Sequence, residues 1–507
     1  MSNLSAPTVL TRTRGHVTAA ALLLAGAVLL AAATGRHLHP LFAWLAPILV
    51  LRYVRTLPSL PALALAAAVY ALAFVAGWWN VFFTGGIQFA IVGSLGVMMF
   101  VPYLADRLLY RRLDTRIAWA AFPLAWASLE YVYSLAGPYG TWGCIAYSQW
   151  GELHLLQLLS ITGLWGFPLL IGAVASLINV AWERGFAKPT AWRPLIGAMA
   201  LMAAVLGFGS LRLALHRPAT TTVRVTAISA DNIDAFESLW APLKQEQGLT
   251  VQGAVTAQAK SQALLNQLFA ASAKAATSGA RVILWSEANA MVLRTDQTTV
   301  QRRAASFAAR HHVYLLATMA ILAPGRPLAA NIAALFGPRG QLLGSYQKHH
   351  PAPGERSAIG RGNMPLVTTP WGRLSWAICY DFDFPAWLHG VEHQGVSLLL
   401  NPAWDSPSID PLHAHMAMFR AIESGASEVR STEDGMSLAV DGLGHTLTHQ
   451  VALASPSGVQ EMDVAIPVRD VFTLYDHVGD AFAWAALAGL AVVALLASQS
   501  RYARPLH

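Results

Sequence analysis

Cysteine is nearly absent from this chain of 507 residues, which contains only Cys144 and Cys379. Cys144 lies in an apolar region that we expect to be associated with a membrane, whereas Cys379 lies in a region of soluble composition. This placement excludes a disulfide framework and predicts that Cys379 is a free thiol. A free cysteine is either a small, inert core residue or a nucleophile.

Charged residues are also scarce. They make up 12% of the chain, against about 25% in a typical soluble protein, while hydrophobic residues make up 55%. This composition excludes an ordinary soluble protein and indicates a membrane protein. The net charge of +7 does not indicate nucleic-acid binding, because the arginines cluster at the ends of apolar runs, where the positive-inside bias places them.

Apolar runs are confined to two regions, which predicts three domains. Residues 1–217 are expected to be a membrane domain, residues 218–477 a domain of soluble composition, and residues 478–507 a last membrane helix with a short tail. We expect seven spans in the first region, because most of its runs approach or exceed the roughly 20 residues that cross a hydrocarbon core. The runs cover residues 17–34, 39–54, 59–79, 87–105, 117–136, 161–182 and 195–213, with the eighth at 481–497. The first run resembles a signal peptide, but further spans follow closely without a persuasive cleavage site, which favours a retained helix.

The basic residues of the membrane regions predict the orientation of the chain. They precede the first span, separate spans two and three, four and five, and six and seven, and follow the last span: Arg12, Arg14, Arg52, Arg55, Arg107, Arg111, Arg112, Arg116, Arg184, Lys188, Arg193, Arg501 and Arg504. The positive-inside rule places these connections and both termini in the cytoplasm. We therefore expect residues 218–477 on the opposite face, which in a Gram-negative cell is the periplasmic side of the inner membrane.

Two features of the membrane domain have open interpretations. The connection at residues 137–160 is rich in glycine and aromatic residues and uncharged until Glu152. It is either an interfacial aromatic belt or a re-entrant floor beneath a lipid-accessible site. Glu130 lies within the fifth run, and an intramembrane carboxylate is costly enough to suggest a function unless it reaches the nearby interface.

The soluble region alternates between strand-like and helix-like segments. The strand-like runs are 222–229, 281–287, 313–319, 331–336, 341–346, 374–379 and 396–400, and the helix-like runs are 250–278 and 299–311. This alternation favours an α/β sandwich of layered sheets with flanking helices over an all-β or all-α domain. The expected fold class is therefore a multi-span α-helical membrane domain joined to an α/β sandwich domain.

Three reactive side chains follow strand-like runs: Glu287, Lys348 and Cys379. Strand ends on one edge of a sheet converge, so these side chains can share a pocket. Because a free thiol has a pKa of about 8.5, a carboxylate can take its proton while an ammonium stabilises the thiolate and, later, an oxyanion. Each residue alone also has a structural interpretation. Glu287 is then a helix cap, Lys348 a solvated loop lysine and Cys379 an inert core residue. Their coincidence at three strand ends favours a catalytic site.

Histidine chemistry is the alternative at this site. His349, His350, His413 and His415 make a Cys-His protease conceivable, but no sequence pattern frames them. His413 and His415 are two positions apart, which does not suit one helical face, and no second pair of ligands stands near. We therefore expect no metal.

The motifs around the three reactive residues resemble a known family. Trp285-Ser-Glu287, Tyr346-Gln-Lys348 and Ile378-Cys379-Tyr380 look like the Glu-Lys-Cys signatures of the nitrilase, or carbon-nitrogen hydrolase, superfamily. The N-terminal spans, the exported placement, the closing helix and the glycine-rich stretch ending in Tyr147-Ser-Gln149 resemble its membrane-embedded branch, the apolipoprotein N-acyltransferases. Residues 416–423 and 430–432 also look like later motifs of that branch, so the resemblance runs over nearly the whole chain.

The resemblance implies a nitrilase-like α-β-β-α sandwich and a two-step acyl transfer without a cofactor. Cys379, deprotonated by Glu287 and assisted by Lys348, would attack the sn-1 ester of a phospholipid and hold the acyl chain as a thioester. The N-terminal amine of the diacylglyceryl-cysteine of a lipoprotein would then accept the chain. The implied supporting residues are Glu355, Tyr380 and Asp381. The implied partners are a phospholipid donor, a lipoprotein acceptor and the membrane, with no nucleic acid.

The chain departs from the family pattern at three places. Asp381 stands where glutamate is usual, the loop from Lys348 to Glu355 is one residue shorter, and Asn401-Pro-Ala-Trp-Asp405 replaces Asn-Asp-Ala-Trp-Phe. These departures leave the acyl-chain specificity and the acceptor open. The alternatives are a membrane-tethered nitrilase-type amidase, an N-acyltransferase with another amine acceptor, and a transporter or scaffold. The last is disfavoured because the sequence has no internal repeat and no paired intramembrane charges.

Overall fold

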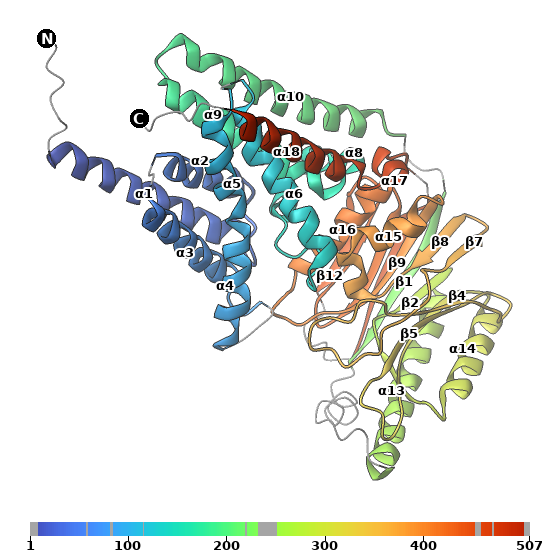
Figure 1. The fold of residues 1–507 in the computed structure, drawn as a ribbon. Helices are drawn as coiled ribbons and strands as arrows, with labels where there is room; N and C mark the ends of the chain where they lie inside the picture. The colour runs from blue at the N-terminus through green and yellow to red at the C-terminus, as the bar shows by residue number, and fades with distance from the viewer. Residues whose placement is uncertain are drawn as a thin grey trace, which may run out of the picture.

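The computed structural model describes residues 9–56, 59–81, 85–114, 116–217, 221–231, 251–451, 458–468 and 471–500. Within these residues the chain forms a group of apolar helices beside a domain of two sheets (Figure 1). The predicted domain boundary at residues 217–218 falls partly outside the described residues, as do the tail residues Arg501 and Arg504.

Each of the eight predicted apolar runs is helical. The helices are α1 (Val9–Ala33), α2 (Pro40–Thr56), α3 (Leu60–Gly77), α4 (Ile87–Met99) with α5 (Val101–Leu109), α6 (Ala121–Ala136), α9 (Gly166–Arg184), α10 (Trp192–Leu215) and α18 (Ala481–Gln499). By length and composition, five helical stretches of the described chain can cross a membrane: Leu60–Gly77, Ile87–Arg112, Leu153–Arg184, Pro189–Leu215 and Ala481–Gln499. The apolar part of α1, Val17–Ala33, and helices α2 and α6 are shorter, so the total of seven spans before the soluble region stays a prediction.

The soluble region contains two sheets that pack face to face around a shared apolar core. The seven-stranded sheet has the order β13, β1, β2, β4, β5, β6, with β3 paired to β4. Its strands are β1 (Thr222–Ala230), β2 (Val282–Trp285), β3 (Ala290–Leu293), β4 (Tyr314–Leu322), β5 (Ala330–Phe336), β6 (Leu342–Gln347) and β13 (Val459–Pro467). In the middle of this sheet β1, β2 and β4 run parallel. The Val-Ile-Leu-Trp run of β2 is buried throughout, as expected of a parallel strand that is covered on both faces.

The six-stranded sheet has the order β12, β11, β10, β9, β8, β7. Its strands are β7 (Leu366–Thr369), β8 (Gly372–Trp376), β9 (Val396–Trp404), β10 (Ser427–Glu433), β11 (Met436–Val440) and β12 (Thr446–Val451). Strands β8, β9 and β10 are parallel. The strand that the sequence predicts to reach Cys379 is β8, and it ends three residues earlier, at Trp376. Cys379 instead begins the short 3-10 helix η6 (Cys379–Asp383).

Helices cover the outer faces of both sheets (Figure 1). α13 (Val251–Thr277) and α14 (Gln297–His311) pack on the seven-stranded sheet, where Phe269 and Phe307 share a buried cluster with Ile283. A second cluster between the sheets holds Leu284 of β2 and Leu400 of β9. α16 (Leu412–Ser424) packs on β10 and β11 of the six-stranded sheet, with α15 (Pro385–Glu392) beside it. The predicted α-β-β-α sandwich is therefore confirmed.

Helix α16 also joins the sandwich to the apolar helices. Met416 and Phe419 belong to the same buried cluster as Trp126 of α6 and Tyr147. The rings of Tyr147 and Phe419 meet edge to face with their centroids 4.9 Å apart. The α16 layer therefore lies between the six-stranded sheet and the helical part of the chain, and a site beside α16 lies at their junction.

Candidate active site

Glu287, Lys348 and Cys379 line one cavity of about 440 Å³. Glu287 and Lys348 follow β2 and β6 of the seven-stranded sheet, whereas Cys379 follows β8 of the six-stranded sheet. The expectation that one edge of one sheet brings them together is therefore wrong. They meet because the two sheets pack face to face and their strand ends open onto a common space. Glu355 and Tyr380 line the same cavity, and Asp381 does not.

Cys379 sits in a strained turn. Its φ of 50° lies in the left-handed region, which for a residue other than glycine costs about 1–3 kcal/mol and persists only where neighbours hold it. Asp381 provides that hold, since its side chain accepts hydrogen bonds from Ile378 N (3.1 Å), Tyr346 Oη (2.8 Å) and His350 N (2.8 Å). Asp381 is fully buried, so its carboxylate lies beneath the turn and holds it.

Lys348 lies between two carboxylates. Its Nζ donates to Glu287 Oε1 at 2.6 Å and to Glu355 Oε2 at 2.7 Å, and Asn331 Nδ2 donates to Glu287 Oε1 at 2.7 Å. The short loop from Lys348 to Glu355 folds back so that the Glu355 carboxylate reaches Lys348. Ala352 N, within this loop, also donates to Glu355 Oε2 at 2.8 Å and fixes its position. The side chain of Lys348 is only 2% exposed, so it cannot be the solvated loop lysine of the alternative interpretation.

Two carboxylates and one ammonium leave this group one negative charge in excess when all three are ionised. Burial would raise the pKa of Glu355, but Lys348 lowers it below its usual range. Burial opposes the charge of Lys348, yet Glu287 and Glu355 raise its pKa well above the usual value. Burial together with Glu355 raises the pKa of Glu287 despite its contact with Lys348. Glu287 is therefore the member of the group best suited to accept and return a proton.

The environment of the Cys379 thiol keeps it protonated. Burial, followed by the charge of Glu287, raises the pKa of Cys379, and Lys348 only partly offsets this. Its Sγ lies 3.7 Å from the carbonyl oxygen of Trp404, and the residue is 4% exposed. A thiol of raised pKa is protonated at neutral pH, so its use as a nucleophile requires removal of the proton as the reaction proceeds.

Residues 250–454, which carry this cavity's reactive side chains, match the family model described as carbon-nitrogen hydrolase. These residues therefore form a carbon-nitrogen hydrolase domain. The chain is 28% identical to an apolipoprotein N-acyltransferase of Geobacter metallireducens over 442 residues, which cover 80% of each chain. It is 27% identical to one of Bradyrhizobium diazoefficiens over 453 residues, which cover 82% of this chain and 80% of the relative. The predicted resemblance to the membrane-embedded branch of the carbon-nitrogen hydrolase superfamily is thereby confirmed.

Among solved structures, an amidase from Nesterenkonia sp. is 19% identical to this chain. The match covers 49% of this chain and 92% of the amidase, with a TM-score of 0.36.

The apolar helical part forms one wall of the cavity, through Val81 and Trp142. Trp142 Nε1 donates to Asp383 Oδ2 at 2.8 Å, and Tyr380 Oη donates to the carbonyl of Pro138 at 3.1 Å. Trp142 also lines a small apolar pocket between α3 and α4, together with Phe74, Trp78, Val92 and Leu95. Of the two interpretations of residues 137–160, these contacts favour the floor beneath the site.

Glu130 faces protein rather than lipid. It is 3% exposed and accepts hydrogen bonds from Trp126 Nε1 (2.8 Å), Cys144 Sγ (2.8 Å) and Ile145 N (3.2 Å). Two of these donors belong to the segment that forms the floor. Glu130 therefore ties α6 to that segment, and it does not reach out to the interface.

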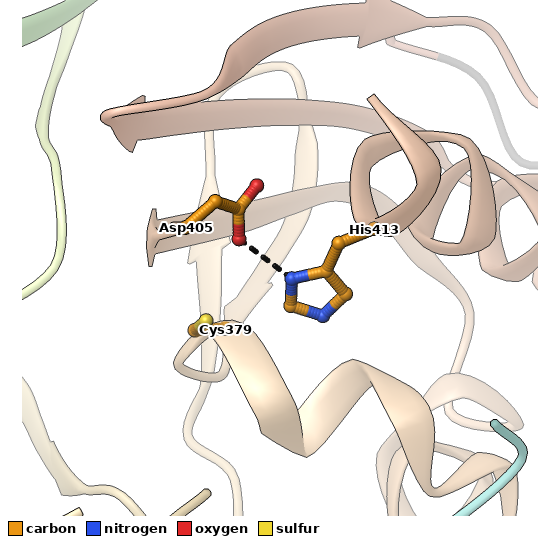
Figure 2. A group of neighbouring side chains, drawn as sticks. All are labelled: Cys379, Asp405 and His413. Atoms are coloured by element: carbon orange, nitrogen blue, oxygen red, sulfur yellow. Dashed lines mark hydrogen bonds and ion pairs between the residues drawn. The ribbon is translucent and has the colours of Figure 1, made fainter. Parts of the chain in front are cut away.

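Sequence reasoning missed a second polar group beside Cys379, centred on His413. His413 Nδ1 lies 2.6 Å from Asp405 Oδ1 (Figure 2), and His413 Nε2 lies 3.1 Å from Asp383 Oδ2. Arg430 Nη2 donates to both oxygens of Asp405 at 2.7 and 2.8 Å. Both imidazole nitrogens are engaged by carboxylates, so His413 offers no lone pair to the thiol and cannot serve as the base of a Cys-His protease in this arrangement.

The same group tests whether a metal fits the site. The sulfur, carboxylate and imidazole atoms of Cys379, Asp405 and His413 lie within 4.8 Å of one another, which is close enough for three ligands of a small cation. The guanidinium of Arg430 already neutralises Asp405 and lies 3.0 Å from His413 Nδ1. A cation among these atoms would meet the charge of Arg430, so this donor set does not fit a metal.

Proposed function

We propose that this enzyme transfers an acyl chain from a phospholipid to the N-terminal amine of the diacylglyceryl-cysteine of lipoproteins, through a thioester on Cys379. The reaction takes place on the periplasmic side of the bacterial inner membrane, and it is the last step of lipoprotein maturation. The observation that carries the proposal is the position of Cys379. Its thiol opens into a cavity with Glu287 and Lys348, and Val81 and Trp142 of the apolar helical part form a wall of that cavity.

In the first step Glu287 takes the proton of the Cys379 thiol, and the thiolate attacks the carbonyl carbon of the sn-1 ester. The negative charge that develops on the carbonyl oxygen is stabilised by the ammonium of Lys348. When the tetrahedral intermediate collapses, the carbon–oxygen bond of the ester breaks and Glu287 returns its proton to the departing alkoxide. A lysophospholipid leaves, and the acyl chain stays on the sulfur.

In the second step the acceptor amine attacks the thioester carbonyl. Glu287 takes a proton from the attacking nitrogen, the carbon–sulfur bond breaks, and the proton passes to the departing thiolate. The products are an amide and the starting thiol, so the cycle consumes no cofactor. Glu287 exchanges a proton in both steps, which agrees with its burial beside Lys348 and with the raised pKa that burial causes.

Two observations support a lipid donor over a small soluble amide. The cavity wall includes Trp142, which also lines an apolar pocket between α3 and α4, so an acyl chain that leaves the cavity on this side meets apolar side chains. The relatives that match along four fifths of this chain are named apolipoprotein N-acyltransferase. A membrane-tethered amidase is the second candidate, and an acyltransferase with another amine acceptor is the third.

The proposal is tested by intact mass spectrometry of the full-length protein in detergent after incubation with phospholipid. We expect a mass increase of one acyl chain that hydroxylamine removes, as it removes thioesters. The Cys379→Ala variant should show no increase, whereas Cys144→Ala, which removes the other thiol of the chain, should keep it. A protein that is folded and exposed to lipid but remains unmodified would overturn the phospholipid-donor mechanism.

The acceptor is identified by adding amines to the isolated acyl-enzyme. A synthetic diacylglyceryl lipopeptide with a free N-terminus should gain the chain and restore the mass of the free enzyme, while the same peptide with an acetylated N-terminus should not. Transfer to other primary amines at an equal rate would favour the third candidate. Release of ammonia from small amides in the absence of lipid would favour the amidase.

A further inference from the structure

His413 is a buried charged group that the proposed mechanism does not use. It is the second residue of α16 and is 1% exposed. Its two carboxylate partners come from different elements: Asp383 ends η6, and Asp405 directly follows β9. Neither carboxylate belongs to α16, so the three side chains come together only when the chain folds.

The distances determine the protonation of His413. Asp405 Oδ1 lies 2.6 Å from Nδ1 and Asp383 Oδ2 lies 3.1 Å from Nε2. An ionised carboxylate only accepts hydrogen bonds, so each of these contacts requires a proton on the ring nitrogen. A neutral ring that accepted from Arg430 at Nδ1 would bring its lone pair to 2.6 Å from a carboxylate oxygen, which is repulsive. His413 is therefore an imidazolium, held at both nitrogens.

The charges around His413 agree with this assignment. Burial and the guanidinium of Arg430 disfavour a charged ring, but Asp383 and Asp405 raise the pKa of His413 well above its usual value. Arg430 in turn lowers the pKa of Asp405, against the effect of burial. Glu428 on β10 is a further carboxyl near the ring, but burial raises its pKa to about 7, so the charge that holds the ring comes from Asp383 and Asp405. Carboxylates thus outnumber Arg430 around His413, and its proton is retained through the neutral range.

The imidazolium faces the sulfur. The sulfur of Cys379, a carboxylate oxygen of Asp405 and a ring nitrogen of His413 lie within 4.8 Å of one another. In Figure 2 the ring edge of His413 is turned toward Cys379. Its positive charge opposes the rise in the pKa of Cys379 that burial and Glu287 cause, as the charge of Lys348 also does. Lys348 reaches the cavity from the seven-stranded sheet, so the sulfur has cations from two different walls.

We propose that His413 is a second cation of this site, an imidazolium fixed by Asp383 and Asp405 that stabilises the Cys379 thiolate. His413 is a positioning residue in this role, because it acts on the sulfur without taking its proton. Asp405, at which the chain departs from the pattern of its family, supplies one of the two carboxylates that hold the charge. The inference rests on the proposed use of Cys379 as the nucleophile, but it does not depend on the identity of the acyl donor or acceptor.

The test is the ionisation of Cys379 in the full-length protein, measured as the rate of alkylation by iodoacetamide between pH 6 and pH 10. Peptide mass spectrometry separates Cys379 from Cys144, so no cysteine has to be replaced. In His413→Gln, which is neutral, we expect the midpoint for Cys379 to rise by about one pH unit and the rate at pH 7 to fall about tenfold. Thermal unfolding of each variant reports whether it is folded.

His415→Gln is the matched control. His415 lies two residues further along α16 and is half-buried. It packs against Trp150 with ring centroids 3.9 Å apart and does not line the cavity. Burial lowers the pKa of His415 to about 3, so it is neutral at pH 7 and its replacement should leave the alkylation profile of Cys379 unchanged. Asp383→Asn keeps His413 but removes one of its carboxylates, and it should raise the midpoint by less than His413→Gln does.

The inference is overturned if folded His413→Gln alkylates with the wild-type profile, or if His415→Gln shifts the midpoint equally. If His413→Gln does not fold, an unshifted profile in Asp383→Asn overturns it. A shift in alkylation together with no thioester on the wild-type enzyme would support His413 and reject the lipid donor. A thioester on the wild-type enzyme, together with no shift in the variants, would support the lipid donor and reject the role of His413.

Discussion

Replacement of Lys348 by methionine tests the charge arrangement of the site. Lys348 Nζ lies 2.6 Å from Glu287 and 2.7 Å from Glu355, and the three side chains are largely buried. Methionine keeps most of the side-chain volume but leaves two carboxylates without a cation. Loss of one partner of a buried ion pair costs about 3–5 kcal/mol, most of it from the uncompensated charge that remains. For a domain of this size that corresponds to a decrease in Tm of roughly 10 °C.

The loss of stability in Lys348→Met should depend on pH. Without the ammonium, burial raises the pKa of Glu287 and Glu355 in the folded state above their values in the unfolded chain. Protonated carboxyls carry no uncompensated charge, so the deficit should be small below about pH 4.5 and should grow as the pH rises toward 8. Thioester formation should fall about 100- to 1,000-fold, since the oxyanion loses its cation.

The assay is thermal unfolding in detergent at pH 5 and pH 8, with Lys274→Met as the matched control. Lys274 also pairs with a carboxylate, Glu461, at 3.0 Å, but its side chain is 72% exposed. An exposed pair of this kind contributes at most about 1 kcal/mol, so its loss should change Tm little at either pH. Equal Tm values for Lys348→Met and Lys274→Met at pH 8 would refute the reasoning, because they would mean that Lys348 is not a buried, paired charge.

Three further variants probe individual groups. Glu287→Gln cannot accept a proton and should slow thioester formation about 10²- to 10⁴-fold at every pH; a wild-type rate would exclude Glu287 as the base. Glu355 raises the pKa of Glu287, so Glu355→Gln should move the rise of the rate with pH to lower pH, and a shift to higher pH would contradict this sign. Asp381→Asn turns one accepting oxygen beneath Cys379 into a donor and should cost about 1–3 kcal/mol, which thermal unfolding measures; an unchanged Tm would show that Asp381 does not hold the turn.

The fold class followed from local patterns in the sequence. Scarce charge and long apolar runs distinguish the helical part from the soluble part, because both can be recognised within a segment of about 20 residues. Each of the eight apolar runs is helical, and alternation of strand-like and helix-like runs led to the sandwich. The predicted end of strand β8 was wrong, because a continuous apolar run does not reveal where the backbone turns. The strand ends at Trp376, before the strained turn at Cys379.

The sequence also indicated which side chains would share a site, because Glu287, Lys348 and Cys379 each follow a strand. It could not indicate that they come from two sheets, since the pairing of strands and the packing of sheets depend on contacts between distant segments. The tertiary structure alone decided which neighbours surround the thiol. His413, Asp383 and Asp405 belong to a helix, a 3-10 turn and the residue after a strand, and no periodicity connects them. Their charges matter because packing removes them from water, and only the folded chain determines which charges become buried together.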